Sequence, residues 1–238
     1  MTRFVAAQLH SLAEGLRLLA AVASVPVDLQ ADIRVICQAV SSLEGVDLPV
    51  YDAHQSSFAY RRLVDDPATL VSPTIEQLGS TLTLLENLSH TPLPLDWVAR
   101  VKVVLDNVRQ RVSSELRSKT VAGVSGLYVI VDPETTRGRP VTDIAEAALR
   151  GGSSVIQLRD KERDKGSVLP TARRLADMCR EHNATFIVND DPSLAVSSGA
   201  DGLHVGQADL PVPEVRQILE LRQFVGRSHN SMEEIAES

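Results

Sequence analysis

The first half of the chain has the apolar spacing of helices. From residue 4 to about residue 117, apolar side chains recur at every third or fourth position, which places them on one face of a helix. Pro67 and Pro73 are expected to end helices, because proline lacks the amide hydrogen and restricts the residue before it. The pattern predicts about four or five helices. Two of them share a leucine spacing that would indicate a helical duplication: Leu12, Leu16, Leu18 and Leu19, and Leu78, Leu82, Leu84 and Leu85.

The second half has a different pattern. After Lys119, short runs of apolar and mostly β-branched residues alternate with segments of helical spacing. The predicted strands are Leu127–Val131, Ser154–Leu158, Thr185–Val188, Gly202–Val205 and Gln223–Gly226. The predicted helices are Val141–Arg150, Val168–His182, Pro192–Ser198, Pro213–Leu221 and a last one that begins near Ser231. We therefore predict a helical domain over residues 1–120 and a second domain over residues 126–238.

Strands that are apolar on both faces and separated by helices are typical of a parallel sheet covered by helices. The predicted fold class is therefore α/β for the second domain, preceded by an all-α domain. The periodicity fits two architectures equally, a doubly wound sheet and a (β/α)8 barrel. In both, functional side chains follow the carboxyl ends of the strands, so the residues directly after each apolar run are the candidates for chemistry.

Composition and charge narrow the functional classes. Apolar residues make up 43% and charged residues 23% of the chain, as in globular proteins. The formal net charge of −7 provides no basic field for a nucleic-acid backbone. Cys37 and Cys179 lack the spacing of a zinc site or a disulfide framework, and no apolar run is long enough to span a bilayer. We therefore expect a cytoplasmic protein that binds neither nucleic acid nor membrane.

Three polar side chains follow the second predicted strand. Gln157, Arg159 and Lys161 occupy alternate positions, so an extended backbone sends them to the same side. The guanidinium offers a fork to phosphate oxygens, the ammonium offers a point charge, and the amide offers both a donor and an acceptor. The trio favours an anionic, heteroaromatic ligand, with a solvated strand end as the alternative.

Carboxylates follow the next two predicted strands. Asp190 comes after the third strand, and Asp209 lies in the loop after the fourth. Because Mg²⁺ prefers one or two carboxylates together with ligand phosphates and water, this pair predicts a Mg²⁺ bridge to a pyrophosphate. Helix N-capping is the alternative use of such an acid, and Asp191, which precedes Pro192, suits it better than Asp190 does.

His204 and Ser228 each have two interpretations. His204, inside the fourth predicted strand, is either a ligand contact or a hydrogen-bonded histidine within the sheet, and its spacing favours the second. Ser228, after the fifth strand, either lines the site or caps the helix that begins near Ser231. For Ser228 the sequence does not decide between them.

Taken in order, these motifs resemble the thiamine phosphate synthases, TIM-barrel enzymes of the thiamine pathway. The matching segments begin near Gly126 and are Leu-Tyr-Val-Ile-Val-Asp at the first strand, Gln-Leu-Arg-x-Lys at the second, Val-Asn-Asp at the third and Ala-Asp-Gly-Leu-His-Val-Gly-Gln-x-Asp at the fourth. The resemblance implies a Mg²⁺-dependent condensation of hydroxymethylpyrimidine pyrophosphate with a thiazole phosphate, which gives thiamine phosphate and pyrophosphate. It further implies substrate binding by Gln157, Arg159, Lys161, Asn189, His204 and Ser228, catalytic roles for Lys161 and Ser228, and a metal held by Asp190 and Asp209.

The resemblance covers part of the family's fold. A complete barrel takes about 200 residues or more, whereas residues 126–238 supply about five βα units. We therefore expect an incomplete (β/α)8 TIM barrel, truncated at the C-terminus, whose open sheet edges favour a homo-oligomer or a completing partner chain. The helical domain is interpreted as a docking or oligomerisation module, and we assign it no catalytic residues.

Two other functions are consistent with the sequence. With one half of the family's site present, the chain can be a non-catalytic binder or a regulatory remnant that holds pyrimidine pyrophosphate. The synthase family commonly has a Ser-x-His motif after the fifth strand, and the proton-transfer histidine of the TenI-type thiazole tautomerases, which share the fold, resembles that position. Here His229 directly follows Ser228. This displacement, together with Lys161, Asp190 and Asp209, favours the synthase over the tautomerase.

Overall fold

The computed structural model describes residues 3–22, 30–31, 33–35, 37–38, 68–87 and 95–236. The chain divides into two compact units, Met1–Glu115 and Leu116–Ser238. The predicted domain boundary, between residues 120 and 126, lies a few residues after this division. Within the described ranges, no helix combines the length and the apolarity that crossing a bilayer requires.

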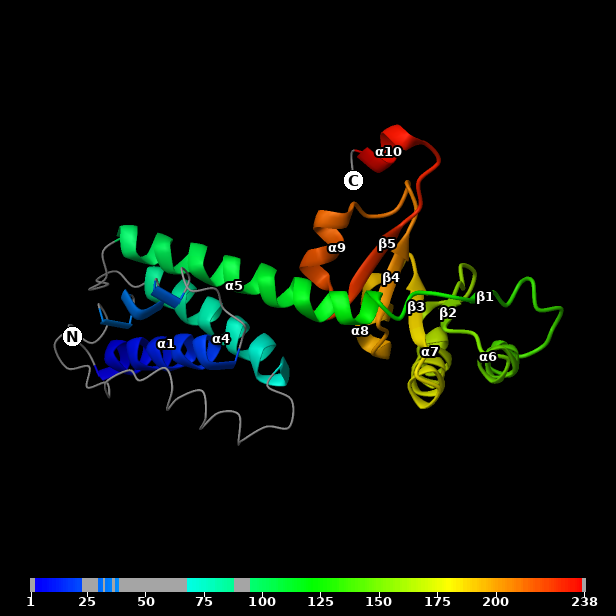
Figure 1. The fold of residues 1–238 in the computed structure, drawn as a ribbon, viewed down its shortest axis with the longest axis horizontal. Coiled ribbons are helices and arrows are strands. Elements are labelled where there is room, and N and C mark those ends of the chain that lie inside the picture. Colours follow the sequence, from blue (N-terminus) through cyan, green and yellow to red (C-terminus); the bar gives the residue numbers. More distant parts are fainter. Residues whose placement is uncertain are drawn as a thin grey trace. The chain divides into compact units, whose positions relative to one another are not determined.

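The helical unit contains α1 (Arg3–Val22), α4 (Ala68–Glu86) and the first part of α5 (Leu95–Val121). Figure 1 shows α1 and α4 side by side, and the two helices pack against each other. Gly15 permits a close approach, because a Cβ at that position would lie 2.6 Å from Cδ2 of Leu78. Most leucines of the shared spacing are fully buried: Leu12, Leu16, Leu19, Leu78, Leu82 and Leu85.

One proline does not end its helix. The sequence predicts a helix end at Pro73, yet Pro73 lies inside α4, so that prediction is wrong. Pro73 falls within the first two turns, where its missing amide hydrogen removes a single internal hydrogen bond. Ile75 and Leu78, which follow it, are buried, and burial of this face offsets the loss. By contrast, α4 begins directly after Pro67, and the segment before Pro67, where the sequence predicts a helix end, lies outside the described residues.

Strands and helices alternate in the second unit. The strands are β1 (Tyr128–Val131), β2 (Val155–Leu158), β3 (Thr185–Asn189), β4 (Gly202–Val205) and β5 (Phe224–Arg227). The helices are α6 (Val141–Arg150), α7 (Lys165–Glu181), α8 (Pro192–Ser198), α9 (Val212–Ile218) and α10 (Met232–Ala236). Each predicted strand agrees with the observed one to within one residue at either end. The predicted end of α9 is wrong by three residues, because the side chain of Gln223 accepts a hydrogen bond from the Glu220 N–H and turns the chain toward β5.

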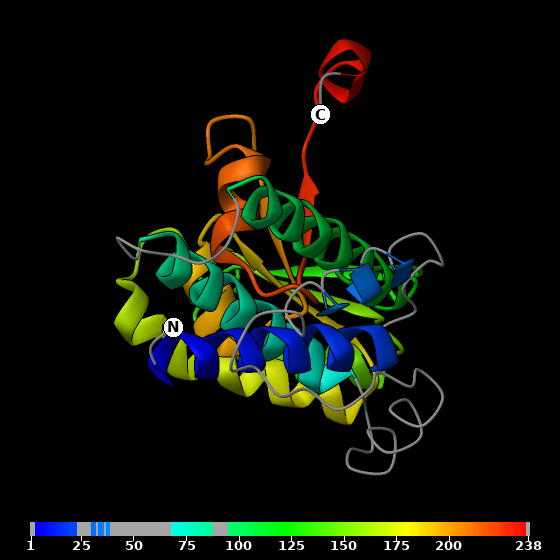
Figure 2. The same ribbon diagram turned by 90° about the vertical axis from the view of Figure 1, so that its left-hand side faces the viewer.

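The five strands form one parallel sheet in the order β1-β2-β3-β4-β5. A doubly wound sheet reverses its direction at a switch point, whereas each strand here lies beside its predecessor. Right-handed crossovers that advance in one direction place the connecting helices on one face, and Figures 1 and 2 show α7, in yellow, along that face. The strand order is therefore that of a (β/α) barrel and not that of a doubly wound sheet. Among the described strands, β1 and β5 lie at the edges.

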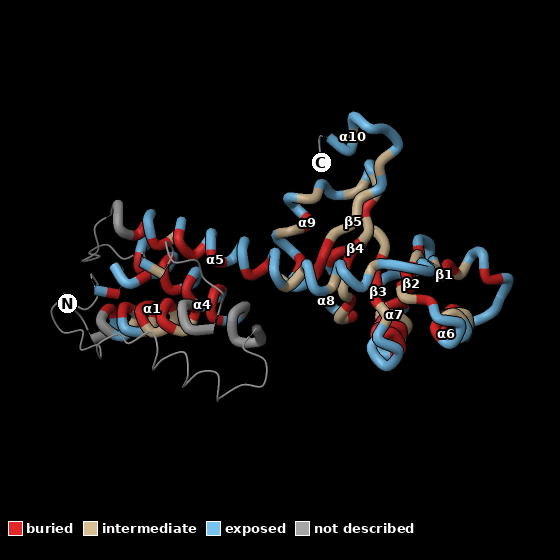
Figure 3. The backbone as a smooth tube through the Cα atoms, viewed as in Figure 1, coloured by how far each residue is buried: buried red, intermediate tan, exposed pale blue. Residues whose placement is uncertain are grey.

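The two faces of the sheet differ in what covers them. On the helix-covered face, buried apolar side chains join one large core with the helices: Ile156, Leu158, Phe186, Val188, Leu203 and Val205. On the opposite face, here called the open face, Val155, Ile187 and Phe224 form a smaller buried cluster against which Val124 packs. Gly202 makes room for Phe224, because a Cβ there would lie 2.7 Å from Cζ of the ring. Figure 3 shows that burial along β2 and β3 gives way to intermediate exposure where β3 ends.

Aspartate caps fix the start of two helices. Asp191 caps α8, because its Oδ1 accepts a hydrogen bond from the Leu194 N–H over 2.8 Å, which confirms the N-cap interpretation of this acid. The start of α7, at Lys165, comes three residues before the predicted one. The reason is Asp164, whose carboxylate accepts a hydrogen bond from the Ser167 N–H over 2.9 Å.

Candidate functional site

The candidate site lies on the open face, where the strands end. Gln157, Asn189 and His204 stand at or near the carboxyl ends of β2, β3 and β4, and Ser228 directly follows β5. The register pairs Asn189 with His204 across β3 and β4. Because parallel strands end at one edge of their sheet, residues far apart in the sequence become neighbours there. These four predicted residues therefore share one face and one edge of the sheet.

A chain of hydrogen bonds crosses the open face from β1 to β3. The hydroxyl of Tyr128 donates to Oε1 of Gln157 over 2.5 Å, and Nε2 of Gln157 donates to Oδ1 of Asn189 over 2.5 Å. Gln157 is only 3% exposed, so its amide atoms need such partners. Loss of hydration raises the pKa of Tyr128 to about 12, so the hydroxyl keeps its proton further into the alkaline range than an ordinary tyrosine does. Sequence reasoning missed Tyr128, although it occupies the open-face position of the first strand's alternation.

The two cations after β2 turn toward different neighbouring strands. Arg159 forms an ion pair with Asp132, which follows β1. Lys161 forms one with Asp190, which follows β3, over 2.9 Å. Their side chains are 37% and 47% exposed, so both charges reach the rim of the site. The sequence predicts a converging trio, whereas the structure keeps Gln157 within the sheet and lets each cation bridge to the end of an adjacent strand.

Two carboxylates at the ends of β3 and β4 have the donor atoms that Mg²⁺ prefers. Asp190 contacts Lys161 through Oδ2, and Oδ2 of Asp209 accepts a hydrogen bond from the Gly206 N–H over 2.7 Å. The Oδ1 atom of each has no hydrogen bond to any residue in the described ranges. No group of three or more His, Cys, Asp or Glu side chains that could hold a metal ion by itself occurs in these ranges. Mg²⁺ in proteins commonly takes one or two carboxylates, with its other ligands from a substrate and from water.

Asp190 has an unusual backbone conformation. Its φ of 64° lies in the left-handed region, which non-glycine residues seldom adopt. Its N–H donates to the carbonyl oxygen of His204 over 2.8 Å, which ties this turn to β4. A strained residue held in place by its surroundings at a strand end is typical of a functional position.

His204 and Ser228 form a hydrogen-bonded pair. Nε2 of His204 lies 2.7 Å from Oγ of Ser228. Burial lowers the pKa of His204, and the charges of Asp190 and Asp209 oppose this shift. Both carboxylates therefore act electrostatically on the imidazole. Gly226 leaves room for the ring, because a Cβ there would lie 3.1 Å from Nδ1 of His204.

The last helix is capped by another serine. Oγ of Ser231 accepts a hydrogen bond from the Glu234 N–H over 3.3 Å, so the N-cap interpretation of Ser228 is wrong. Gln207, a residue that sequence reasoning missed, donates from Nε2 to the carbonyl oxygen of Ser228 and accepts from Nη2 of Arg227 over 2.9 Å. These two contacts tie the loop after β4 to the end of β5.

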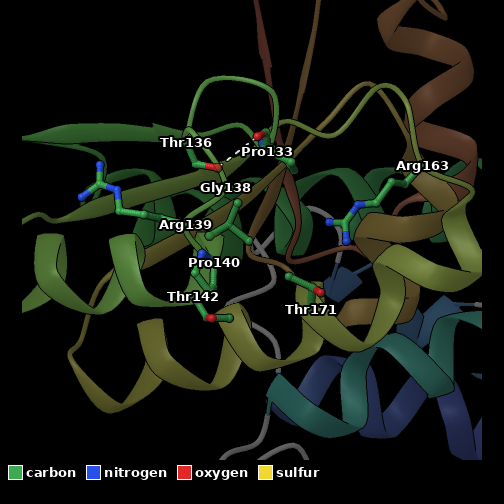
Figure 4. Close-up of a pocket in the computed structure, with 9 residues that line it drawn as sticks. Pro133, Thr136, Gly138, Arg139, Pro140, Thr142, Arg163 and Thr171 are labelled. Carbon is green, nitrogen blue, oxygen red and sulfur yellow. Dashed lines mark hydrogen bonds between the residues drawn. The ribbon is translucent and has the colours of Figure 1, made fainter.

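A separate pocket has a volume of about 330 Å³. It is lined by the loop after β1, the start of α6, Arg163 in the loop before α7, and Thr171 in α7. Figure 4 shows the guanidinium of Arg163 pointing toward the middle of the labelled residues and that of Arg139 pointing away from them. Arg163 is also paired with Asp160 over 2.5 Å. None of the residues predicted for the site lines this pocket.

Comparisons with known proteins match the same part of the chain. Residues 127–238 match the family model described as thiamine monophosphate synthase. A thiamine-phosphate synthase of Shouchella clausii is 44% identical over 112 residues, which cover 47% of this chain and 54% of that protein. One of Laribacter hongkongensis is 40% identical over 111 residues, which cover 46% and 53%. The chain therefore spans about half the length of the relatives that it matches.

A solved thiamine phosphate pyrophosphorylase from Pyrococcus furiosus is 32% identical, with a TM-score of 0.43 over 47% of this chain and 53% of that one. The motifs after β2, β3 and β4 all lie inside the residues that the family model matches. The family model and the sequence relatives agree on the same name. Residues 127–238 of the chain are therefore similar to the thiamine monophosphate synthases.

Proposed function

We propose that the second unit carries the pyrimidine-pyrophosphate site of a thiamine phosphate synthase. The reaction joins hydroxymethylpyrimidine pyrophosphate to a thiazole phosphate and releases pyrophosphate. The observation that carries the proposal is the gathering of cations, acids, amides and a serine–histidine pair at one edge of the open face. The relatives that share this half of the sequence are named for the same product.

Two cations supply the positive charge that a leaving pyrophosphate needs. The ammonium of Lys161 is 2.9 Å from Asp190 and about half exposed, so it stands beside the carboxylate and within reach of a phosphate in solvent. Arg159 contacts Asp132 through Nη1, which leaves the other side of its planar fork for phosphate oxygens. When the carbon–oxygen bond to pyrophosphate breaks, negative charge grows on the leaving oxygen, and fixed cations stabilise it.

Asp190 and Asp209 would hold Mg²⁺ through their Oδ1 atoms, which have no partner in the described part of the chain. When bound, the ion supplies further neutralisation of the departing pyrophosphate. Asp190 thus serves two cations, because Lys161 already contacts its other oxygen.

Amide and hydroxyl groups orient the reacting molecules. Asn189, whose Oδ1 accepts a hydrogen bond from Nε2 of the buried Gln157, presents its amide at the end of β3, and Ser228 stands exposed directly after β5. His204, whose pKa burial lowers, hydrogen-bonds to Ser228. These groups hold the pyrimidine so that its methylene carbon faces the thiazole nitrogen, whose lone pair forms the new carbon–nitrogen bond.

Formation of thiamine phosphate tests the proposal. The full chain is incubated with both substrates and Mg²⁺, and the product is measured by chromatography together with released pyrophosphate. We expect equal amounts of the two and loss of both when EDTA removes the metal. Asp190→Asn should slow product formation about tenfold or more, because it removes a metal ligand charge while asparagine tolerates the left-handed backbone. The matched control is Asp177→Asn, on an exposed surface of α7.

The outcomes separate two functions. Binding of pyrimidine pyrophosphate in calorimetry without any product would leave a binding role and contradict the synthase. A chain that is folded by circular dichroism yet neither binds the pyrimidine substrate nor forms product would contradict both. Equal losses in Asp190→Asn and Asp177→Asn would remove the assigned metal site.

A further inference from the structure

We propose that Tyr128 is a positioning residue that fixes the direction of the Asn189 amide, so that the site offers a hydrogen-bond donor to an acceptor atom of the ligand. The inference rests on the proposed function and adds a residue of β1 to a site otherwise built from later strands. Its basis is the hydrogen-bond chain from Tyr128 through Gln157 to Asn189.

The directions of both amides follow from the single hydroxyl proton of Tyr128. Because Tyr128 donates to Oε1 of Gln157, the Nε2 of Gln157 turns to Asn189 and uses its Oδ1 as the acceptor. With both amides reversed, Gln157 would donate to the phenol oxygen, and the phenol proton would have no acceptor within the described ranges. Gln157 is 3% exposed, so it cannot turn to solvent instead. With Tyr128 as the donor, the bonds of this chain are made between the three side chains themselves and need no solvent partner.

Asn189 therefore presents its NH₂ group to the site. This Nδ2 bonds to no residue in the described part of the chain, and Asn189 is half-buried at the end of β3, beside Asp190. The ammonium of Lys161, which is also a donor only, stands at the same strand end. The edge thus selects an acceptor, and a phosphate oxygen or a pyrimidine ring nitrogen supplies this chemistry.

Titration calorimetry with two probes distinguishes these two sources. In the presence of Mg²⁺, inorganic pyrophosphate offers phosphate oxygens alone, and hydroxymethylpyrimidine offers the ring alone. Tyr128→Phe should weaken binding of the probe that contacts Asn189 by about fivefold, the effect of one hydrogen bond. The control is Ile130→Val, two residues along the same strand and 53% exposed, which should change the dissociation constant less than about twofold.

A double-mutant cycle separates positioning from a general effect on the fold. In an Asn189→Ala background, Tyr128→Phe should have no further effect beyond about twofold, because Tyr128 acts through Asn189. The same fold loss in both backgrounds, or no loss in either, would overturn the inference. An unaltered, folded chain that binds neither probe would overturn the proposed function as well. Binding that Tyr128→Phe leaves unchanged would contradict the inference alone.

Discussion

The helix-covered face and the open face of the sheet are built from alternating residues of the same strands, yet they differ in chemistry. Leu158 and Val188 are each 1% exposed and belong to the apolar core under the helices. Gln157 and Asn189, one position away from them, join in a hydrogen-bond chain on the other side. A strand with a period of two can therefore stabilise the fold with one set of residues and hold a ligand with the other.

The open face also differs along the length of its strands, between their amino ends and their carboxyl ends. Near the amino ends, Val155, Ile187 and Phe224 form a buried apolar cluster covered by Val124. Polar side chains take over toward the carboxyl ends, where Asn189 pairs in register with His204. The polar groups thus gather at a part of the described sheet that the small apolar cluster does not cover. Substitutions on the two faces should separate stability from binding.

The largest expected effect is on the helix-covered face. Phe186→Ala removes a ring that is 1% exposed and should lower the free energy of unfolding by about 3–5 kcal/mol. On the open face of the same strand, Asn189→Ala should cost about 1 kcal/mol, the value of one side-chain hydrogen bond. Chemical denaturation followed by circular dichroism measures both. Similar losses for the two variants would contradict the assigned division between the faces.

Smaller effects on stability and binding should distinguish the apolar part of the open face from its polar part. A Cβ at Gly202 would lie 2.7 Å from the ring of Phe224, so Gly202→Ala should destabilise the second unit by about 1–3 kcal/mol without a direct effect on the site. A Cβ at Gly226 would lie 3.1 Å from Nδ1 of His204. Gly226→Ala should therefore cost less stability and weaken pyrophosphate binding more. Denaturation and calorimetry on both variants test the contrast, and a reversed order would disprove it.

The smallest effect is a titration. The pKa of Tyr128 is about 12 in the folded chain and 10 in its ordinary state, because its hydroxyl has lost hydration. Between these two pH values the folded state keeps a proton that the unfolded state has lost, so the free energy of unfolding should fall as the pH rises. Phenolate absorbance is measured against pH for the unaltered chain and for Tyr128→Phe. The difference between the two curves is the titration of Tyr128 alone among the three tyrosines. A midpoint at pH 10 would contradict the buried hydrogen-bond chain.

The sequence predicts the sheet well because its strands are short, apolar and bounded by turn residues. Each strand was located to within one residue, and the polar residues after β2, β3 and β4 do gather at one edge. The choice between a doubly wound sheet and a barrel needs the strand order, which local periodicity does not contain. The predicted helix end at Pro73 and the predicted start of α7 are wrong, because packing against α1 in one case and the Asp164 cap in the other outweigh the local pattern.

The site's internal contacts are harder to predict than its members. Arg159 and Lys161 share a direction in an isolated strand, but Asp132 and Asp190 on either side of β2 draw them apart. In the sequence, Tyr128 is indistinguishable from the other strand-forming residues around it. Its role depends on the strand register, which pairs it with Val155 and brings its hydroxyl to Gln157. Such partners lie on other strands, so a single segment of sequence does not contain them.

Hydrogen exchange tests most directly whether the carboxyl-end edge of the open face is the ligand site. Amide exchange is compared by mass spectrometry for the full chain with and without Mg²⁺ and hydroxymethylpyrimidine pyrophosphate. The account predicts new protection in residues 157–161, 189–191 and 204–209, and no change in residues 3–22 or 68–87. Protection confined to residues 133–142, around the pocket beside α6, would contradict it.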